Sequence, residues 1–216
     1  MRPRQILDWA RIRLRCGGHF KHLYWEHDRV SVDFHYSPIS ELDALRGVAL
    51  HYLGLYGTAV TDWSQLRALD FRALNVGGTT FDEIGVLDGK ALIALELYQT
   101  SVRSLAGIQS LPLELLQIGG TQIRDFSRVA RLPLRTLLML NCQAEDLSFL
   151  AGLDLERFGC TFTPATRGLE TLRGMRRLQW VHTTEHDSFS AAEFWHRFAH
   201  RLPLDEKLRS YRTGER

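Results

Sequence analysis

The sequence has 216 residues, of which 44% are hydrophobic and 24% are charged, and its formal net charge is +2. This composition is ordinary for a folded protein and excludes a disordered or collagen-like chain. The longest apolar run is far shorter than the ~20 residues of a membrane-spanning helix, and the basic N-terminus lacks the apolar core of a signal peptide, so we expect a cytoplasmic protein without membrane association.

Residues 1–30 are predicted to form an N-terminal cap. They carry seven Lys or Arg residues and three Asp or Glu residues. An arginine-rich segment within them contains Leu7, Trp9, Ile12 and Leu14, which are expected to lay an apolar face on the first repeat. An open stack of repeats needs such an end unit, because water would otherwise reach the last layer of the core.

Residues 31–182 are predicted to form an array of about seven repeats with a period of 21 residues. One unit reads Leu-x-x-Leu-x-Leu-x-x-Thr-x-Val-x-Asp-x-x-x-Leu-x-x-Leu. Its clearest columns are a leucine column of Leu53, Leu74, Leu95, Leu116, Leu137 and Phe158, and a threonine column of Thr58, Thr79, Thr100, Thr121, Cys142 and Thr163. A unit this short cannot bury its apolar side alone, so the units must stack and share one core.

Within each unit, the two leucines of Leu-x-Leu are two residues apart and therefore point to the same face of a strand. The other residues leave room for a turn, a short helical or 3-10 segment and a return, which makes the strands of stacked units parallel neighbours. Two further columns suit the turns, since aspartate caps a helical segment and glycine adopts a positive φ. They are Asp62, Asp125 and Asp146, and Gly57, Gly78 and Gly120.

The repeat resembles those of the leucine-rich repeat family, in particular the short bacterial classes that include the internalins. The resemblance covers about residues 30–182, with threonine where the family usually carries asparagine; a buried threonine hydroxyl is predicted to serve by bonding to neighbouring backbone. The resemblance implies an α/β fold, namely a right-handed solenoid with one parallel β-sheet on its concave face. Short helical or 3-10 turns are expected on the convex face, and the caps are expected to contain α-helix.

In this fold, the residues between and after the inward leucines form three columns on the concave sheet. Exposed apolar area rimmed by polar groups indicates a partner surface, and tyrosine is enriched at interface hot spots. Gly77 and Gly119 alternate with large residues in one column and are expected to leave grooves. Alternatively, the exposed apolar side chains have no functional meaning or are covered by the C-terminal tail. The predicted partner-binding residues are Tyr52, Tyr56, Asn75, Glu96, Tyr98, Leu115, Gln117, Leu138, Leu140 and Arg157.

Residues 183–216 are predicted to form a capping helix and a tail. A helical run over residues 191–202 places Phe194 and Phe198 four residues apart, with Trp195 beside them. Such an aromatic face would cover the last strand of the array.

Histidines near the C-terminus raise an enzymatic alternative. His182 and His186 are four residues apart, as are His196 and His200, and Glu193 precedes His196 by three residues. On a helix this would be a metal-ligand spacing. However, the sequence contains no HExxH, phosphate-binding loop or nucleophile motif, and its three cysteines show no CxxC spacing. We therefore predict that the protein is not an enzyme and holds no metal or cofactor.

The predicted function is non-catalytic binding of a protein or peptide on the concave sheet, with an inhibitor or immunity-type protein as a sub-hypothesis. The alternatives are a small metal-dependent enzyme built on the C-terminal His/Glu cluster, and a structural adaptor that uses its basic caps. Residues 31–170 carry a net charge of −5, whereas the two ends together carry +7. The acidic array disfavours nucleic acid as the main ligand. We expect a monomer.

Overall fold

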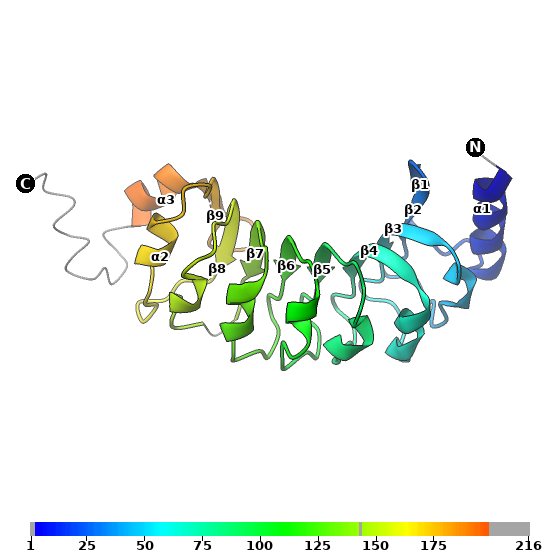
Figure 1. Cartoon of the computed structure of the whole chain (residues 1–216), viewed down its shortest axis with the longest axis horizontal. Helices are drawn as coiled ribbons and strands as arrows, with labels where there is room; N and C mark the ends of the chain where they lie inside the picture. Colours follow the sequence, from blue (N-terminus) through cyan, green and yellow to red (C-terminus); the bar gives the residue numbers. More distant parts are fainter. Residues whose placement is uncertain (1–2, 143, 199–216) are drawn as a thin grey trace, which may run out of the picture.

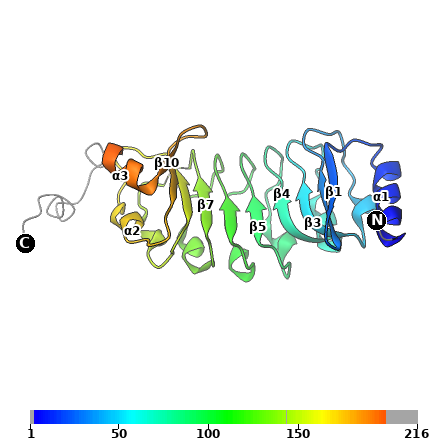
Figure 2. The same ribbon diagram turned by 90° about the horizontal axis from the view of Figure 1, so that it is seen from above.

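Each repeat unit folds into one short strand and, on the opposite side of the coil, one short helical turn. The computed structural model describes residues 3–142 and 144–198. The strands lie along the inner side of a gently curved rod and the helical turns along its outer side (Figure 1, Figure 2). This arrangement confirms the predicted fold class.

The strands form a single sheet in which their order follows the chain. From β2 to β9, each strand pairs in parallel with the next, as the repeat predicts. The strands are β1 (His22–Glu26), β2 (Arg29–Asp33), β3 (Ala49–Gly54), β4 (Asp70–Asn75), β5 (Ala94–Glu96), β6 (Leu115–Gln117), β7 (Thr136–Met139), β8 (Arg157–Cys160), β9 (Trp180–His182) and β10 (Ser188–Ser190).

The two outermost strands differ from the predicted all-parallel sheet. β1 pairs antiparallel with β2, and β10 pairs antiparallel with β9. The reason is the length of the connections, because a parallel neighbour requires a crossover of about a dozen residues whereas a short turn allows only an antiparallel hairpin. Two hairpins therefore flank the parallel repeats.

The outer side of the rod consists of short 3-10 helices. They span Asp43–Leu45, Trp63–Ala68, Ile84–Leu87, Ile108–Ser110, Ser127–Arg131 and Ser148–Leu150. The predicted aspartate caps are present, since each aspartate accepts a hydrogen bond from the backbone amide two residues later. The bonds run from Ser64 to Asp62 (3.1 Å), from Ser127 to Asp125 (2.9 Å) and from Ser148 to Asp146 (2.8 Å).

Positive φ angles recur at the turn after each of the strands β2 to β7. The values are +58° at Tyr36, +62° at Gly57 and at Gly78, +55° at Gln99, +66° at Gly120 and +59° at Asn141. Three of these positions hold the glycines that were predicted to adopt a positive φ. The same backbone conformation also forms at the three equivalent positions that hold Tyr, Gln or Asn. A left-handed conformation costs such residues about 1–2 kcal/mol, so stacking of the repeats outweighs local preference here.

The inward columns form one continuous core. All members of the leucine column are at most 1% exposed. Thr100 and Thr121 are also buried, and their hydroxyls donate to the carbonyl oxygen three residues earlier at 2.8 and 2.7 Å. The predicted structural role of the threonine column is thereby confirmed.

The regularity ends in the last unit. Thr163 and Ala165, which continue two columns in the sequence, are exposed, whereas Thr166 is buried. The Thr163 hydroxyl lies 3.3 Å from the Thr166 hydroxyl and does not donate to the carbonyl oxygen three residues earlier, as the hydroxyls of Thr100 and Thr121 do. The repeat step therefore changes before β9.

Helix α1 (Pro3–Arg15) packs on the N-terminal end of the array through Ile12, which is fully buried. Leu7 and Leu14 do not pack inward as expected but are 70% and 81% exposed, and Trp9 is also exposed. At 100° per residue, Leu7 and Leu14 lie on nearly the opposite side of the helix from Ile12. None of the described helices is long and apolar enough to cross a bilayer.

At the other end, helix α2 (Glu170–Arg173) lies between β8 and β9, and helix α3 (Ala191–Phe198) follows β10. Phe194 is fully buried, and its ring centroid lies 5.2 Å from that of Phe162. Ser190 and Glu193 form a capping box, in which the Glu193 carboxylate accepts from the Ser190 amide at 2.9 Å and the Glu193 amide donates to the Ser190 hydroxyl at 3.3 Å. Residues 199–202 of the predicted helical run lie outside the described residues.

Candidate functional site

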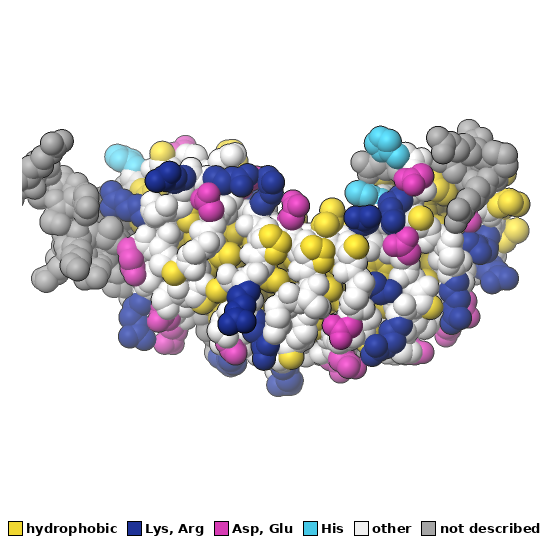
Figure 3. Space-filling view, viewed as in Figure 1, with side chains coloured by type: hydrophobic (Ala, Val, Ile, Leu, Met, Phe, Trp, Pro, Cys, Tyr) yellow, Lys and Arg dark blue, Asp and Glu magenta, His cyan; other side chains and the backbone are white. Residues whose placement is uncertain are grey.

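Two of the predicted surface columns are rows across the sheet. The first runs through Tyr52, Ala73, Ala94, Leu115, Thr136, Arg157 and Trp180, and the second through Gly54, Asn75, Glu96, Gln117, Leu138, Gly159 and His182. We call these rows, together with the turn residues that follow each strand, the strand face. Hydrophobic side chains gather in the hollow of the rod, between two raised ends that carry charged side chains (Figure 3).

A polar network crosses the first half of the strand face, from β2 to β5. His35 Nε2 lies 3.1 Å from the Tyr52 hydroxyl and 3.4 Å from Asp33 Oδ1. Asn75 donates from Nδ2 to Glu96 Oε2 at 3.0 Å, and its Oδ1 accepts from the backbone amide two residues later at 2.9 Å. Asn75 is only 7% exposed, so it holds Glu96 in place and offers little surface of its own to a partner.

Burial controls the protonation of this network. Burial raises the pKa of the Glu96 carboxyl, and burial together with the charges of Glu96 and Asp33 raises the pKa of Tyr52. Burial also lowers the pKa of His35, although the Asp33 charge opposes this shift. His35 is therefore mainly neutral at pH 7. Its imidazole ring then supplies no positive charge to the neighbouring Asp33 carboxylate.

The grooves that were expected at Gly77 and Gly119 are not present, because neighbouring residues fill the space above both glycines. A Cβ on Gly77 would lie 2.7 Å from the Tyr56 ring and 2.9 Å from the Tyr98 carbonyl oxygen, and one on Gly119 would lie 2.7 Å from the Leu140 carbonyl oxygen. The large side chains lean onto the glycines of the next repeat and fill the space above them. The glycines are thus required for close packing.

The second half of the strand face, from β6 to β9, is more apolar. Its half-buried members are Leu115, Gln117, Thr136, Leu138 and His182. Arg157 is exposed and pairs in register with Trp180, which is 42% exposed. Leu140 is only 9% exposed, so it contributes to packing and not to the accessible surface that we expected of it. Burial, together with the Arg157 charge, lowers the pKa of His182.

The loop between β9 and β10, residues 183–187, reaches back over the strand face. The Glu185 carboxylate accepts a hydrogen bond from the Tyr98 hydroxyl and another from Asn141 Nδ2 at 3.5 Å. The bond to Glu185 and burial together raise the pKa of Tyr98 to about 12. With Leu140 and Thr161, the loop encloses a pocket of about 280 Å³. Tyr98, one of the predicted partner-binding residues, thus already makes a hydrogen bond within the chain.

Sequence reasoning missed four residues of this surface. His35 and Tyr36 lie one repeat step upstream of Tyr56 and Gly57, so the 21-residue period contained a signal for them. Trp180 lies 23 residues after Arg157 and falls out of step. The contact of Glu185 with Tyr98 spans 87 residues, and no pattern in the sequence announces it.

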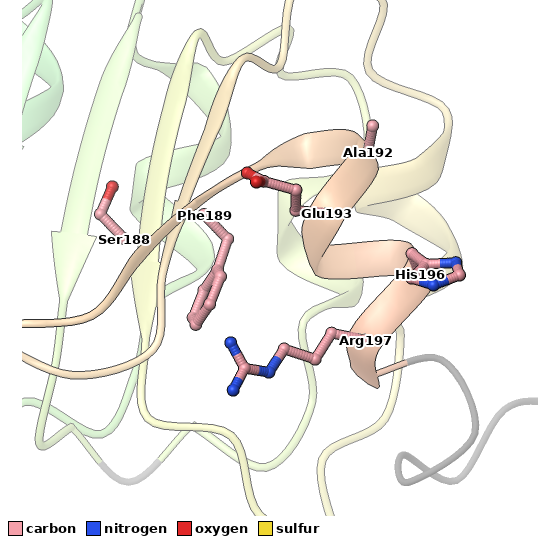
Figure 4. Close-up of a pocket in the computed structure, with 6 residues that line it drawn as sticks. All are labelled: Ser188, Phe189, Ala192, Glu193, His196 and Arg197. Carbon is pink, nitrogen blue, oxygen red and sulfur yellow. The ribbon is translucent and has the colours of Figure 1, made fainter.

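The C-terminal histidines do not form the alternative metal centre among the described residues. Glu193 is engaged in the capping box, and His196 projects from α3 in a different direction (Figure 4). The pocket beside them has a volume of about 620 Å³, and the Arg197 guanidinium lies 5.4 Å from the centroid of the Phe189 ring at its side. Within residues 3–142 and 144–198, no three His, Cys, Asp or Glu side chains are grouped to hold a metal ion. His200 lies outside the described residues.

Comparison with known proteins places the fold. No family model matches the sequence, and no curated protein matches it closely enough to serve as a relative. Among solved structures, the chain is similar to internalin C2 from Listeria monocytogenes, with a TM-score of 0.57 and 22% identity over 68% of this chain and 67% of that one. It is also similar to an internalin (inlF) from the same organism, with a TM-score of 0.54 and 18% identity over 71% of this chain and 59% of that one.

These similarities agree with the architecture described above. Internalins are leucine-rich repeat proteins, and the ten-stranded sheet with its 3-10 turns has the form of their repeats. The identities are too low to carry more than the fold. What the strand face binds must therefore be argued from its own residues.

Proposed function

We propose that this chain, which has a leucine-rich repeat fold, is a non-catalytic module that binds a protein or peptide on its strand face. The fold is in general suited to protein–protein interaction, because stacked repeats present a long continuous surface. The observation that supports the site is the concentration of hydrophobic side chains in the hollow of the rod (Figure 3), together with the half-buried Tyr52, Tyr56 and Tyr98 of the strand face. Tyrosine combines a large apolar ring with a hydroxyl, which suits interface anchors.

The proposed contact surface is narrower than the predicted set. The residues that keep accessible surface are Tyr52, Tyr56, Glu96 and Tyr98 in the first half and Leu115, Gln117, Leu138 and Arg157 in the second. Asn75 and Leu140 support these residues from below. An inhibitor or immunity-type role is one form that such binding takes, since blocking a partner requires only a complementary surface.

We further propose that the protein acts as a monomer in the cytoplasm. Cys16, Cys142 and Cys160 are unpaired and buried, which suits a reducing compartment. Burial also raises the pKa of all three thiols. Such cysteines act as small apolar groups and not as nucleophiles.

The test is quantitative capture from an extract of the cells that make the protein. The wild type is compared with a Tyr56→Ala/Tyr98→Ala variant and with a Gln109→Ala/Arg128→Ala variant, whose two changes lie on the exposed outer side. We expect one protein to be retained by the wild type and by the outer variant and to be lost from the tyrosine variant, with thermal unfolding of each variant showing that it is folded at the temperature of the capture. Equal retention by all three proteins would move the binding site away from the strand face.

A further inference from the structure

The first half of the strand face combines carboxylates with tyrosine rings. We call Asp33, Tyr52, Tyr56, Glu96 and Tyr98 the acidic tyrosine surface. A Cβ on Gly54 would lie 2.8 Å from the Tyr52 ring and 3.0 Å from Asp33 Oδ1, so the Asp33 carboxylate lies close to this ring. The charge of Glu96 also acts on Tyr52. On the far side of Tyr98, the Glu185 carboxylate adds a third negative charge.

Glu96 is the central group of this surface. Its half-buried carboxylate receives a hydrogen bond from Asn75, but no Lys, Arg or His of the described residues lies within ion-pair distance of it. The alanines Ala73 and Ala94 occupy the neighbouring row between Tyr52 and Leu115. Their short side chains leave the approach to Glu96 less obstructed than longer residues would.

The chain itself places a cation on a tyrosine at the edge of this surface. The Lys21 ammonium lies 4.9 Å from the centroid of the Tyr36 ring, and the Tyr36 ring centroid lies 5.3 Å from that of Tyr56. An ammonium or guanidinium within about 6 Å of an aromatic centroid is attracted by the negative face of the ring. The aromatic group that includes Tyr56 is thus already in contact with one positive charge.

We propose that the acidic tyrosine surface binds an arginine or lysine side chain of a basic segment in the protein partner, with Glu96 as its ion-pair acceptor and the tyrosine rings of the same surface, Tyr56 among them, as its aromatic contacts. This inference rests on the proposed function, because it assumes that the strand face is the contact surface. Arginine suits the site best, since its planar guanidinium bonds to a carboxylate and stacks on an aromatic ring at the same time. A partly buried carboxylate without an ion pair gains most from such a group.

The test uses the full chain and hexa-arginine as the probe, with hexa-glutamate as the peptide of opposite charge. Glu96→Gln removes the charge while its amide oxygen can still accept from Asn75. Glu83→Gln removes the same charge from an exposed position outside the strand face. We expect hexa-arginine to bind the wild type in a salt-sensitive manner, to bind Glu96→Gln at least about tenfold more weakly, and to bind Glu83→Gln as it binds the wild type. A Tyr56→Leu variant should bind about two- to fivefold more weakly.

The inference is overturned if hexa-arginine does not bind the wild type at low salt, if it binds no better than hexa-glutamate, or if the two glutamate variants weaken its binding equally. These outcomes are separable from failure of the proposed function. If the Tyr56→Ala/Tyr98→Ala variant loses partner capture but peptide binding does not depend on Glu96, the partner binds the strand face without a basic segment at Glu96. If peptide binding depends on Glu96 but the tyrosine variant captures the partner as the wild type does, the surface binds basic side chains and the partner docks elsewhere.

Discussion

The two halves of the strand face share one backbone but differ in chemistry. From β2 to β5, the strand face carries tyrosines and carboxylates, and hydrogen bonds link polar side chains of neighbouring repeats, as between Asn75 and Glu96. From β6 to β9, leucines and one exposed arginine replace them, and Glu185 of the β9–β10 loop reaches back to Tyr98. The comparison shows that stacking fixes where each surface position lies, whereas the residue placed there sets what that half of the rod can recognise.

The largest expected difference between the halves concerns the glycines beneath their large side chains. Gly77→Ala should lower the free energy of unfolding by about 2–3 kcal/mol, because its Cβ would meet both the Tyr56 ring and the Tyr98 carbonyl oxygen at under 3 Å. The latter oxygen is fixed by a 2.8 Å hydrogen bond from Gly78. Denaturant unfolding measures the change.

Gly159→Ala is the comparison variant in the second half, at a glycine that lies within strand β8 and not in a turn. Its Cβ would lie 2.9 Å from Leu138 Cδ2, the tip of a flexible side chain, and 3.3 Å from His182 Cβ. The leucine can rotate away, so we expect a loss below about 1 kcal/mol. Equal decreases in the free energy of unfolding for the two variants would mean that the Tyr56 ring moves aside as easily as the Leu138 side chain.

The second expected effect concerns the threonine column, whose hydroxyl bond persists to Thr121 and is lost at Thr163, in the last unit. Thr100→Val removes a buried hydroxyl that donates to the Leu97 carbonyl oxygen, and should cost about 1–2 kcal/mol. Thr163→Val removes an exposed hydroxyl beside Thr166 and should change stability by less than about 0.5 kcal/mol. Thermal and denaturant unfolding of both variants would test the contrast, and an unchanged Thr100→Val would remove the column's structural role.

The contrast between halves also explains what the sequence could predict. The inward columns follow from the 21-residue step, because a buried leucine or threonine satisfies the same stacking requirement in every unit. The rows of the strand face followed equally well, and Tyr52, Glu96 and Arg157 lie in the rows expected of them. The packing of side chains between repeats could not be predicted in this way. A column of the repeat gives the residue type at one position, whereas the contact of the Tyr56 ring with Gly77 depends on how two neighbouring repeats pack together.

The remaining differences arise where the period is lost. β1 and β10 are joined to their neighbours by short hairpins and carry no repeat signature. The contact between Glu185 and Tyr98 depends on the path of such a hairpin loop. Helix α1 was misjudged for another reason: Leu7 and Leu14 are apolar but lie on the side opposite Ile12, and composition alone does not distinguish the two sides.

The third expected effect is a pH-dependent gain in stability from Glu96→Gln. Because burial raises the pKa of Glu96 in the folded state, the wild type loses stability as the pH rises from the unfolded value of about 4.3 through the folded value. Glutamine stays neutral, so this variant should melt a few degrees higher than the wild type at pH 7 and at the same temperature near pH 4 or below. A variant that melts lower than the wild type at pH 7 would show that the Glu96 charge stabilises the fold, which contradicts its description as an unpaired, partly buried carboxylate.

The smallest expected effect tests whether the β9–β10 loop links the two halves. Tyr98→Phe keeps the ring over Gly119 but removes the hydroxyl that donates to Glu185. A hydrogen bond to an exposed side chain contributes little, so the free energy of unfolding should change by less than about 0.5 kcal/mol. Hydrogen exchange at the backbone amides of residues 183–187 should nevertheless become severalfold faster, because the loop loses its contact with the first half.

Glu185→Gln is the complementary change, since an amide can still accept from Tyr98 and exchange should stay nearer to the wild type. Unchanged exchange in Tyr98→Phe would mean that the loop is held by its own turn, in which the Thr184 hydroxyl accepts from the amides of His186 and Asp187 at 3.2 and 3.0 Å. In that case the two halves of the strand face would be independent surfaces.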